Sequence, residues 1–94
     1  MEIQRQKHGA KGAFFIEEGG ESLAEMTYTK AGVTKIIIDH TEVDASFKGE
    51  GIGKDLVKAG VGFARQNNLK IIPPCPFAKA EFEKHVEYAD VLAD

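Results

Sequence analysis

The sequence predicts a single α+β domain in which an antiparallel β-meander is followed by a β-α-β crossover and a C-terminal helix. Three observations support this fold class. The first half contains short runs with strand-like alternation, separated by glycine-containing turns. Between residues 51 and 66 the apolar spacing changes to a helical period. A short β-branched run over residues 69–72 then precedes a proline-rich break.

Three strands are expected before residue 44. Residues 13–16 are aromatic and β-branched, and residues 23–28 alternate so that Ala24, Met26 and Tyr28 share one face. Residues 34–43 predict a long strand built around consecutive isoleucines. The segments 17–21 and 30–32 contain glycines that can adopt positive φ, and turns this short join antiparallel neighbours.

A helix is expected over residues 51–66 because small and apolar side chains fall on one wide arc: Ile52, Leu56, Val57, Ala59, Gly60, Val61, Phe63 and Ala64. An arc this wide indicates that the helix lies on the sheet and is covered on a flank as well. Gly60 falls within the arc, which predicts a close approach to the sheet. The strand at 69–72 should then pair in parallel with the strand at 34–43, since such crossovers are right-handed.

The proline-rich segment 73–76 should break that strand and begin a second helix over residues 77–88, with Ala78, Phe82 and His85 on one face. Cys75 would then lie at or near the N-cap position. A thiol at the N-terminus of a helix has a lowered pKa, because the partial positive charge there stabilises a thiolate. Pairs of glutamates at 17–18 and at 81 and 83 are interpreted as solvated surface.

Composition and charge exclude several classes of protein. The 94 residues predict one domain over residues 1–94, and a net charge of −3 argues against a nucleic-acid binder. The basic residues Arg5, Lys7, Lys11 and Lys30 are scattered along the sequence and form no tract. No run of apolar residues is long enough for a membrane span or a secretory signal, so no membrane association is expected.

Cysteine and histidine usage leads to further expectations. The single cysteine cannot form an internal disulfide, which favours a reducing compartment and therefore a cytoplasmic protein. The three histidines and one cysteine have no metal-ligand spacing, so no metal is predicted. A chain of this size with a wide apolar helix face is expected to be a monomer or a weak homodimer.

A glycine-rich loop joins the long strand to the first helix and predicts an anion site. Its residues are Lys48, Gly49, Glu50, Gly51, Ile52, Gly53 and Lys54. Glycines let backbone N–H groups approach a ligand, and the helix start adds unpaired donors and a positive dipole end, which together suit phosphate. The P-loop pattern fails at both ends, and the Rossmann pattern would need glycine where Lys54 stands. A tight turn with no ligand is the alternative explanation.

Residues 43–54 resemble the signature of the GNAT acetyltransferase superfamily, in which a strand-ending valine and an aromatic residue precede Arg/Gln-x-x-Gly-x-Gly/Ala at a helix start. Lys48, Gly51 and Gly53 fall on that signature, with Lys48 in place of the usual Arg or Gln. Residues 40–43 and 74–77 resemble a minimal GNAT-like subfamily, and the resemblance covers residues 13–88. It implies binding of acetyl-CoA by the loop and by Thr41 and Val43, between splayed parallel strands.

The resemblance leaves two functions open. The first is an acetyl-CoA-dependent N-acetyltransferase-type enzyme that moves an acetyl group to an unknown acceptor, through Cys75. The second is a binding module that is acetylated on Cys75 without turnover. Cys75 is expected near the splay as nucleophile or acid, and as a small buried hydrophobe otherwise. His40, expected on the strand face of Ile36 and Ile38, is the candidate general base, with Glu42 as its partner, or a core residue.

One departure from larger relatives concerns the acceptor. Full-sized GNAT enzymes have two helices between their first strands that help to build the acceptor site. In this sequence only turns connect those strands, at residues 17–21 and 30–32. Acceptor recognition is therefore expected to differ, or to be supplied by a partner.

Overall fold

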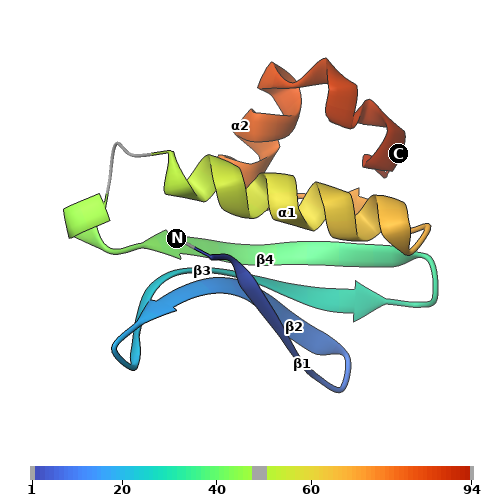
Figure 1. The fold of residues 1–94 in the computed structure, drawn as a ribbon. Helices are drawn as coiled ribbons and strands as arrows, with labels where there is room; N and C mark the ends of the chain where they lie inside the picture. The colour runs from blue at the N-terminus through green and yellow to red at the C-terminus, as the bar shows by residue number, and fades with distance from the viewer. Residues whose placement is uncertain (1, 48–50, 94) are drawn as a thin grey trace.

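The computed structural model describes residues 2–47 and 51–93 as a mixed sheet covered on one face by helices (Figure 1). The five strands lie in the order β1-β2-β3-β4-β5. Strands β1 to β4 form an antiparallel meander, and β5 is parallel to β4. Helix α1 connects β4 to β5, as expected of a β-α-β crossover, so the predicted fold class is confirmed.

The strands follow the predicted order with one addition at the N-terminus. Their bounds are β1 Gln4–His8, β2 Lys11–Glu18, β3 Glu21–Ala31, β4 Lys35–Val43 and β5 Lys70–Ile72. Strand β1 was not predicted, because all five of its side chains are exposed and no apolar alternation marks it. Backbone pairing with β2 alone defines this strand, with Gln4 opposite Phe15 and His8 opposite Lys11.

The helical elements are α1 Ile52–Gln66, α2 Pro76–Lys84 and short 3-10 turns at Ala45–Phe47 and Val86–Val91. The second helix was predicted to reach residue 88, which is wrong. It ends at Lys84, since His85 leaves the helical region with φ −115° and ψ 88°. A 3-10 segment then packs Tyr88 against Phe82, with ring centroids 5.7 Å apart.

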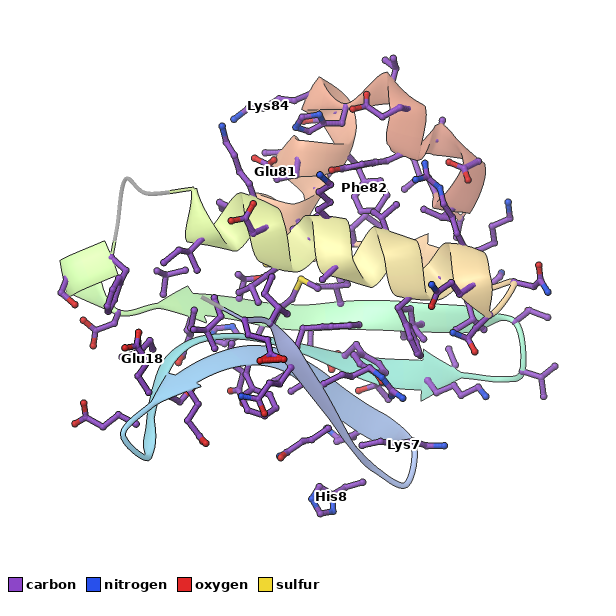
Figure 2. The ribbon with its side chains drawn as sticks, in the orientation of Figure 1. Lys7, His8, Glu18, Glu81, Phe82 and Lys84 are labelled. Atoms are coloured by element: carbon purple, nitrogen blue, oxygen red, sulfur yellow. The ribbon has the colours of Figure 1, made fainter. Side chains whose placement is uncertain are left out.

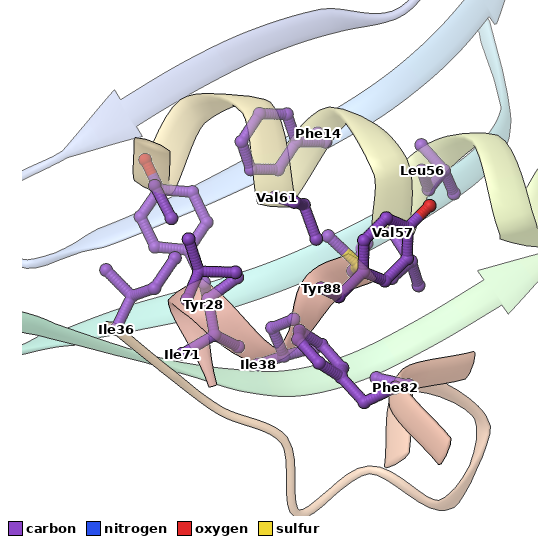
Figure 3. Close-up of a cluster of buried hydrophobic side chains, with 14 of the residues drawn as sticks. Phe14, Tyr28, Ile36, Ile38, Leu56, Val57, Val61, Ile71, Phe82 and Tyr88 are labelled. Atoms are coloured by element: carbon purple, nitrogen blue, oxygen red, sulfur yellow. The ribbon is translucent and has the colours of Figure 1, made fainter. Parts of the chain in front are cut away.

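The core lies between α1 and the helix-facing side of the sheet, and Phe82 and Tyr88 from the segments after β5 extend it (Figure 3). The predicted inward residues of β3 are buried, and Met26 has no exposed surface. Leu56, Val57 and Val61 of α1 are likewise buried. A Cβ built on Gly60 would lie 2.9 Å from Cε of Met26, so the predicted close approach of α1 to the sheet is confirmed.

The chain after α2 folds back over the end of α1 and the outer edge of β5. Arg65 donates two hydrogen bonds to the Asp90 carboxylate, both 2.9 Å long. Beyond it, Leu92 forms a parallel bridge with Ile71, and the Ala93 N–H donates to the Ile71 carbonyl at 2.9 Å. The tail therefore continues the sheet at the edge of β5.

In the described part of the chain, no helix is both long and apolar enough to span a membrane. Within those residues there is also no group of three or more histidine, cysteine, aspartate or glutamate side chains arranged to hold a metal ion.

Gly12 is required where β2 passes the Tyr28 ring. A Cβ at Gly12 would lie 2.3 Å from Cζ of Tyr28, and that ring is buried between Phe14 and Phe63. We expect Gly12→Ala to lower the free energy of unfolding by about 1–3 kcal/mol, as overpacked core substitutions do. Chemical denaturation followed by circular dichroism measures this change.

Gly62→Ala is the matched control. Gly62 lies within α1, and a Cβ there would meet nothing within 4 Å. Alanine at this helical position should raise the free energy of unfolding by up to about 1 kcal/mol. Equal effects of the two substitutions would contradict the packing described for Gly12.

Candidate functional site

Strand β4 extends well beyond its parallel neighbour, and this difference opens the sheet. The last pair in the β4–β5 ladder joins Ile37 to Ile72, after which β4 continues to Val43 without β5 beside it. Pro73 and Pro74 stop β5, because proline has no N–H to donate to a ladder. The splayed parallel pair that was expected is therefore present.

A cavity of about 520 Å³ lies where β4 ends and α1 begins. Apolar surface predominates in its lining, which comprises Thr41, Val43, Phe47, Gly51, Ile52, Gly53, Lys54 and Phe77. All of the described residues among the predicted cofactor-binding set line this cavity. The other three, Lys48, Gly49 and Glu50, lie outside the residues that the structure describes.

The N-terminus of α1 presents backbone donors to this cavity. The N-cap residue is Gly51, which has a left-handed φ of 75° and no side chain that could accept a hydrogen bond from the first turn. The Asp55 N–H donates to the Gly51 carbonyl at 3.1 Å, which leaves the N–H groups of residues 52–54 without a partner among the described residues. Such donors, with the positive end of the helix dipole, favour an anionic group.

The two described glycines of the loop have different structural roles. Gly51 is needed for its positive φ, which other residues adopt at a cost. At Gly53, a Cβ would lie 2.6 Å from Cζ of Phe77, so this glycine lets the start of α2 pack against the start of α1. The cavity is thus closed on one side by the Phe77 ring.

A β-bulge in β4 decides which side chains face the cavity. Tyr28 of β3 pairs with Ile38, but Thr27 pairs with His40, so Asp39 is the extra residue. Beyond the bulge the alternation is reversed. Thr41 and Val43 now lie opposite Met26 and Ala24, on the helix-facing side.

His40 consequently lies on the open face of the sheet. The prediction that it shares a face with Ile36 and Ile38 is wrong, because the bulge at Asp39 separates them. Its side chain is 65% exposed, and its Nε2 lies 2.8 Å from Oε1 of Glu42. The expected partnership between His40 and Glu42 is therefore present, on the opposite side of the sheet from Thr41.

Cys75 is the N-cap residue of α2, as predicted, and lies beside Thr41. Its thiol donates to the Thr41 hydroxyl with an Sγ–Oγ1 distance of 3.7 Å, and it makes no fully formed cap hydrogen bond. Burial acts to raise the pKa of the thiol, but the Ala78 N–H, the Thr41 hydroxyl and the Phe77 N–H lower the pKa below its ordinary value. Thr41 thus links the half-buried cysteine to the cavity.

A second, polar groove of about 620 Å³ adjoins the first and was not predicted. Its lining residues are Ser22, Leu23, Ala24, Glu25, Thr41, Glu42, Val43 and Asp44, so the two cavities share Thr41 and Val43. Glu25 and Glu42 lie directly opposite each other across β3 and β4, which concentrates negative charge. The N–H and hydroxyl of Ser46 donate to Asp44 and lower the pKa of that carboxyl.

Glu81 of α2 differs from its predicted position on the solvated surface. It is 2% exposed and lies on the inner side of α2 next to Phe82 (Figure 2). Its carboxylate is 3.6 Å from Nζ of Lys84 and 3.4 Å from Nε2 of His85. His85 therefore lies beside a buried carboxylate at the end of α2.

Comparison with known proteins identifies the family. The model of the GCN5-related N-acetyl-transferase family matches residues 13–91. The chain therefore belongs to the GCN5-related N-acetyl-transferase family, in agreement with the resemblance found in the sequence.

Individual relatives agree with this assignment. A GCN5-like protein of Staphylococcus aureus with a solution structure is 44% identical, with a TM-score of 0.73 over 98% of this chain and 87% of that one. Protein NATD1 of Xenopus tropicalis is 35% identical over 57 residues, which make up 61% of this chain. The match spans 52% of NATD1, about half the length of that relative.

A more distant structure shares the fold alone. The ribosomal-protein-S18-alanine N-acetyltransferase of Escherichia coli is 13% identical, with a TM-score of 0.67 over 83% of this chain and 53% of that one.

The contact between Thr41 and Cys75 has a measurable consequence. Thr41→Val removes a hydroxyl that lowers the pKa of the Cys75 thiol, so this pKa should rise. Because the thiolate is the reactive form, alkylation by iodoacetamide at neutral pH should slow roughly threefold. Mass spectrometry of the alkylated protein at several pH values measures both quantities.

Thr27→Val is the matched control, since Thr27 lies opposite His40 on the open face of the sheet. It should leave the alkylation rate unchanged. A wild-type rate in the Thr41→Val variant would show that Thr41 does not influence the thiol.

Proposed function

We propose that this chain binds acetyl-CoA in the cavity between the end of β4 and the start of α1, and transfers its acetyl group through Cys75 to an acceptor. The observation that best supports the proposal is the convergence of Thr41, Val43 and residues 51–54 on one cavity. Family membership supports the same donor class.

The cavity fits the two chemically different parts of such a donor. No described residue accepts from the N–H groups of residues 52–54, which suit phosphate oxygens, and Lys54 adds a positive charge. Val43, Phe47 and Phe77 offer an apolar wall to the less polar arm of the donor. When bound, acetyl-CoA supplies an activated acetyl thioester.

In this proposal Cys75 is the nucleophile. Its thiolate forms a bond to the acetyl carbonyl carbon while the bond from that carbon to the sulfur of CoA breaks. CoA departs as a thiolate that takes up a proton, and Cys75 is left as a thioester. The amine nitrogen of the acceptor then bonds to the acetyl carbon while the bond from that carbon to the sulfur of Cys75 breaks, which restores the thiolate. The lowered pKa of the Cys75 thiol and its contact with Thr41 support this role, because a thiolate is the attacking species.

The polar groove next to the cavity supports an acceptor that approaches from the open face of the sheet. Glu25 and Glu42 give this groove a negative charge that would favour a cationic amine. His40 contacts Glu42 on this open face and does not itself line the groove. In this proposal it removes a proton from the amine as the amine enters the groove, before the amine reaches the thioester on the helix-facing side. The amine class follows from the charge of the groove.

One structural feature favours a second function, that of a binding module acetylated on Cys75 without turnover. Strands β1 to β4 are joined by turns alone, so no helix between them encloses the polar groove. The bound donor would then be held without an enclosed acceptor site. Continuous release of CoA in the presence of amines distinguishes an enzyme from this module.

Incubation with acetyl-CoA followed by intact mass spectrometry tests the role of Cys75. We expect one added acetyl group in the wild-type protein and none in the Cys75→Ser variant, because serine at the same position is a much weaker nucleophile. Amide shifts of Thr41, Val43 and residues 51–54 on addition of CoA to both proteins test donor binding separately. Binding without acetylation would reject Cys75 as nucleophile while keeping the donor site.

His40→Gln tests the general base, provided that turnover with an amine is observed. Loss of a positioned base should reduce kcat/KM about a hundredfold and change its dependence on pH. Thr27→Val, which alters the neighbouring position on the same face, serves as the control. An unchanged pH profile in the His40→Gln variant would remove His40 from the mechanism.

A further inference from the structure

A third cavity, at the other end of α1, gathers basic residues that are scattered along the sequence. Its volume is about 210 Å³, and four of its lining residues are cationic: Arg5, Lys7, Lys11 and Lys30. Phe63 in the last turns of α1 also lines it, whereas Gly53 at the first turn lines the cavity proposed for acetyl-CoA. Gly53 and Phe63 are about 15 Å apart along the helix axis, at about 1.5 Å per residue.

The register of the first two strands explains the position of Arg5 and Lys7 in this cavity. Arg5 pairs with Phe14 and Lys7 with Gly12, so both basic side chains lie on the helix-facing side of β1. Lys7 and the next residue, His8, extend in different directions from the strand (Figure 2). Lys30 is placed beside the β1–β2 turn by its N–H, which donates to the Ala10 carbonyl at 2.6 Å.

Arg5 is positioned by two contacts within this cavity. Its guanidinium carbon lies 4.5 Å from the centroid of the Phe63 ring, and its Nη1 donates to the Tyr28 hydroxyl at 2.9 Å. Tyr28 is only 4% exposed, yet no described residue accepts a hydrogen bond from its O–H. The buried hydroxyl therefore offers one donor at the wall of the cavity.

The charge of this cavity is not balanced by the described residues. No acidic residue lines it, and none of its four cations has a described carboxylate within 4.0 Å. The C-terminal end of α1 carries roughly half a negative charge, which offsets only a small part of this excess. The whole chain has a net charge of −3, so the basic cavity differs from the molecule around it.

We propose that this cavity binds a small phosphate-class oxyanion, either free phosphate or a phosphate monoester. The three lysines provide positive charge for phosphate oxygens. Arg5, which Tyr28 and Phe63 hold in place, adds directed donors. The volume of about 210 Å³ is below the roughly 300–1,000 Å³ that encloses drug-sized ligands, which favours a single phosphate group over a nucleotide. Binding would relieve the repulsion among the four cations.

The test is a titration of the full chain with sodium phosphate, followed by amide NMR shifts and compared with sodium chloride at equal ionic strength and pH. We expect saturable shifts of Lys7, Lys11 and Lys30 with phosphate only. Glycerol 3-phosphate, titrated in the same way, shows whether a monoester is preferred over the free ion. Shifts confined to residues 51–54, or equal shifts with chloride, would overturn the proposal.

A pair of double variants makes the test specific. Lys7→Gln with Lys30→Gln should weaken phosphate binding roughly fivefold to tenfold and reduce the increase in Tm that a given phosphate concentration causes. Lys58→Gln with Lys79→Gln removes the same charge from exposed positions of α1 and α2 and should leave both properties unchanged. Equal weakening in the two variants would mean that phosphate binding depends only on the net charge of the protein, and would reject a specific site in this cavity.

Discussion

Strand β4 is the element on which the candidate site depends, because it pairs with β3 along its length but with β5 only at its beginning. The ladder to β5 ends at Ile37, and the bulge at Asp39 follows within the same strand. The first feature opens the sheet, and the second turns Thr41 and Val43 toward the helices. Without both, the cavity would lack either its opening or these two side chains.

Two glycines let α1 pack closely against both the sheet and α2. Gly60 lets the helix approach Met26, and Gly53 lets Phe77 approach the first turn. Both contacts fix the N-terminus of α1 relative to the end of β4. Backbone donors can favour an anion only when they are held in place in this way, since mobile donors would lose entropy on binding. The glycines of α1 therefore contribute through packing as much as through flexibility.

The sequence predicted those parts of the fold that are marked by hydrophobic spacing. The alternation of residues 23–28 and the wide arc of α1 were confirmed because burial of apolar surface determines both. Strand β1 was missed, since its polar side chains leave only backbone pairing to define it. The second helix was predicted too long because Tyr88 and Val91, which follow Lys84, are buried from a 3-10 segment instead.

In the candidate site, too, local sequence patterns predicted some features, and others depend on pairing between strands. The glycine and helix pattern predicted residues 51–54 of the cavity lining, the family resemblance added Thr41 and Val43, and neither indicated Phe47 or Phe77. The prolines were enough to place Cys75 at an N-cap. The orientation of His40 depends on one extra residue in β4, which no local pattern indicates. The acidic groove and the basic cavity depend on cross-strand register, so residues distant in sequence had to be paired before either could be found.

The C-terminal tail has a consequence for how copies of this chain can meet. A sheet exposes unpaired backbone groups at its two outer strands, and such strands can recruit further chains. The tail occupies part of one margin through Leu92 and Ala93, and β1 presents charged and polar side chains at the other. Continuous intermolecular β-sheets are thereby discouraged at both margins, so a contact between two copies would form more readily through the uncovered sheet face than by strand addition.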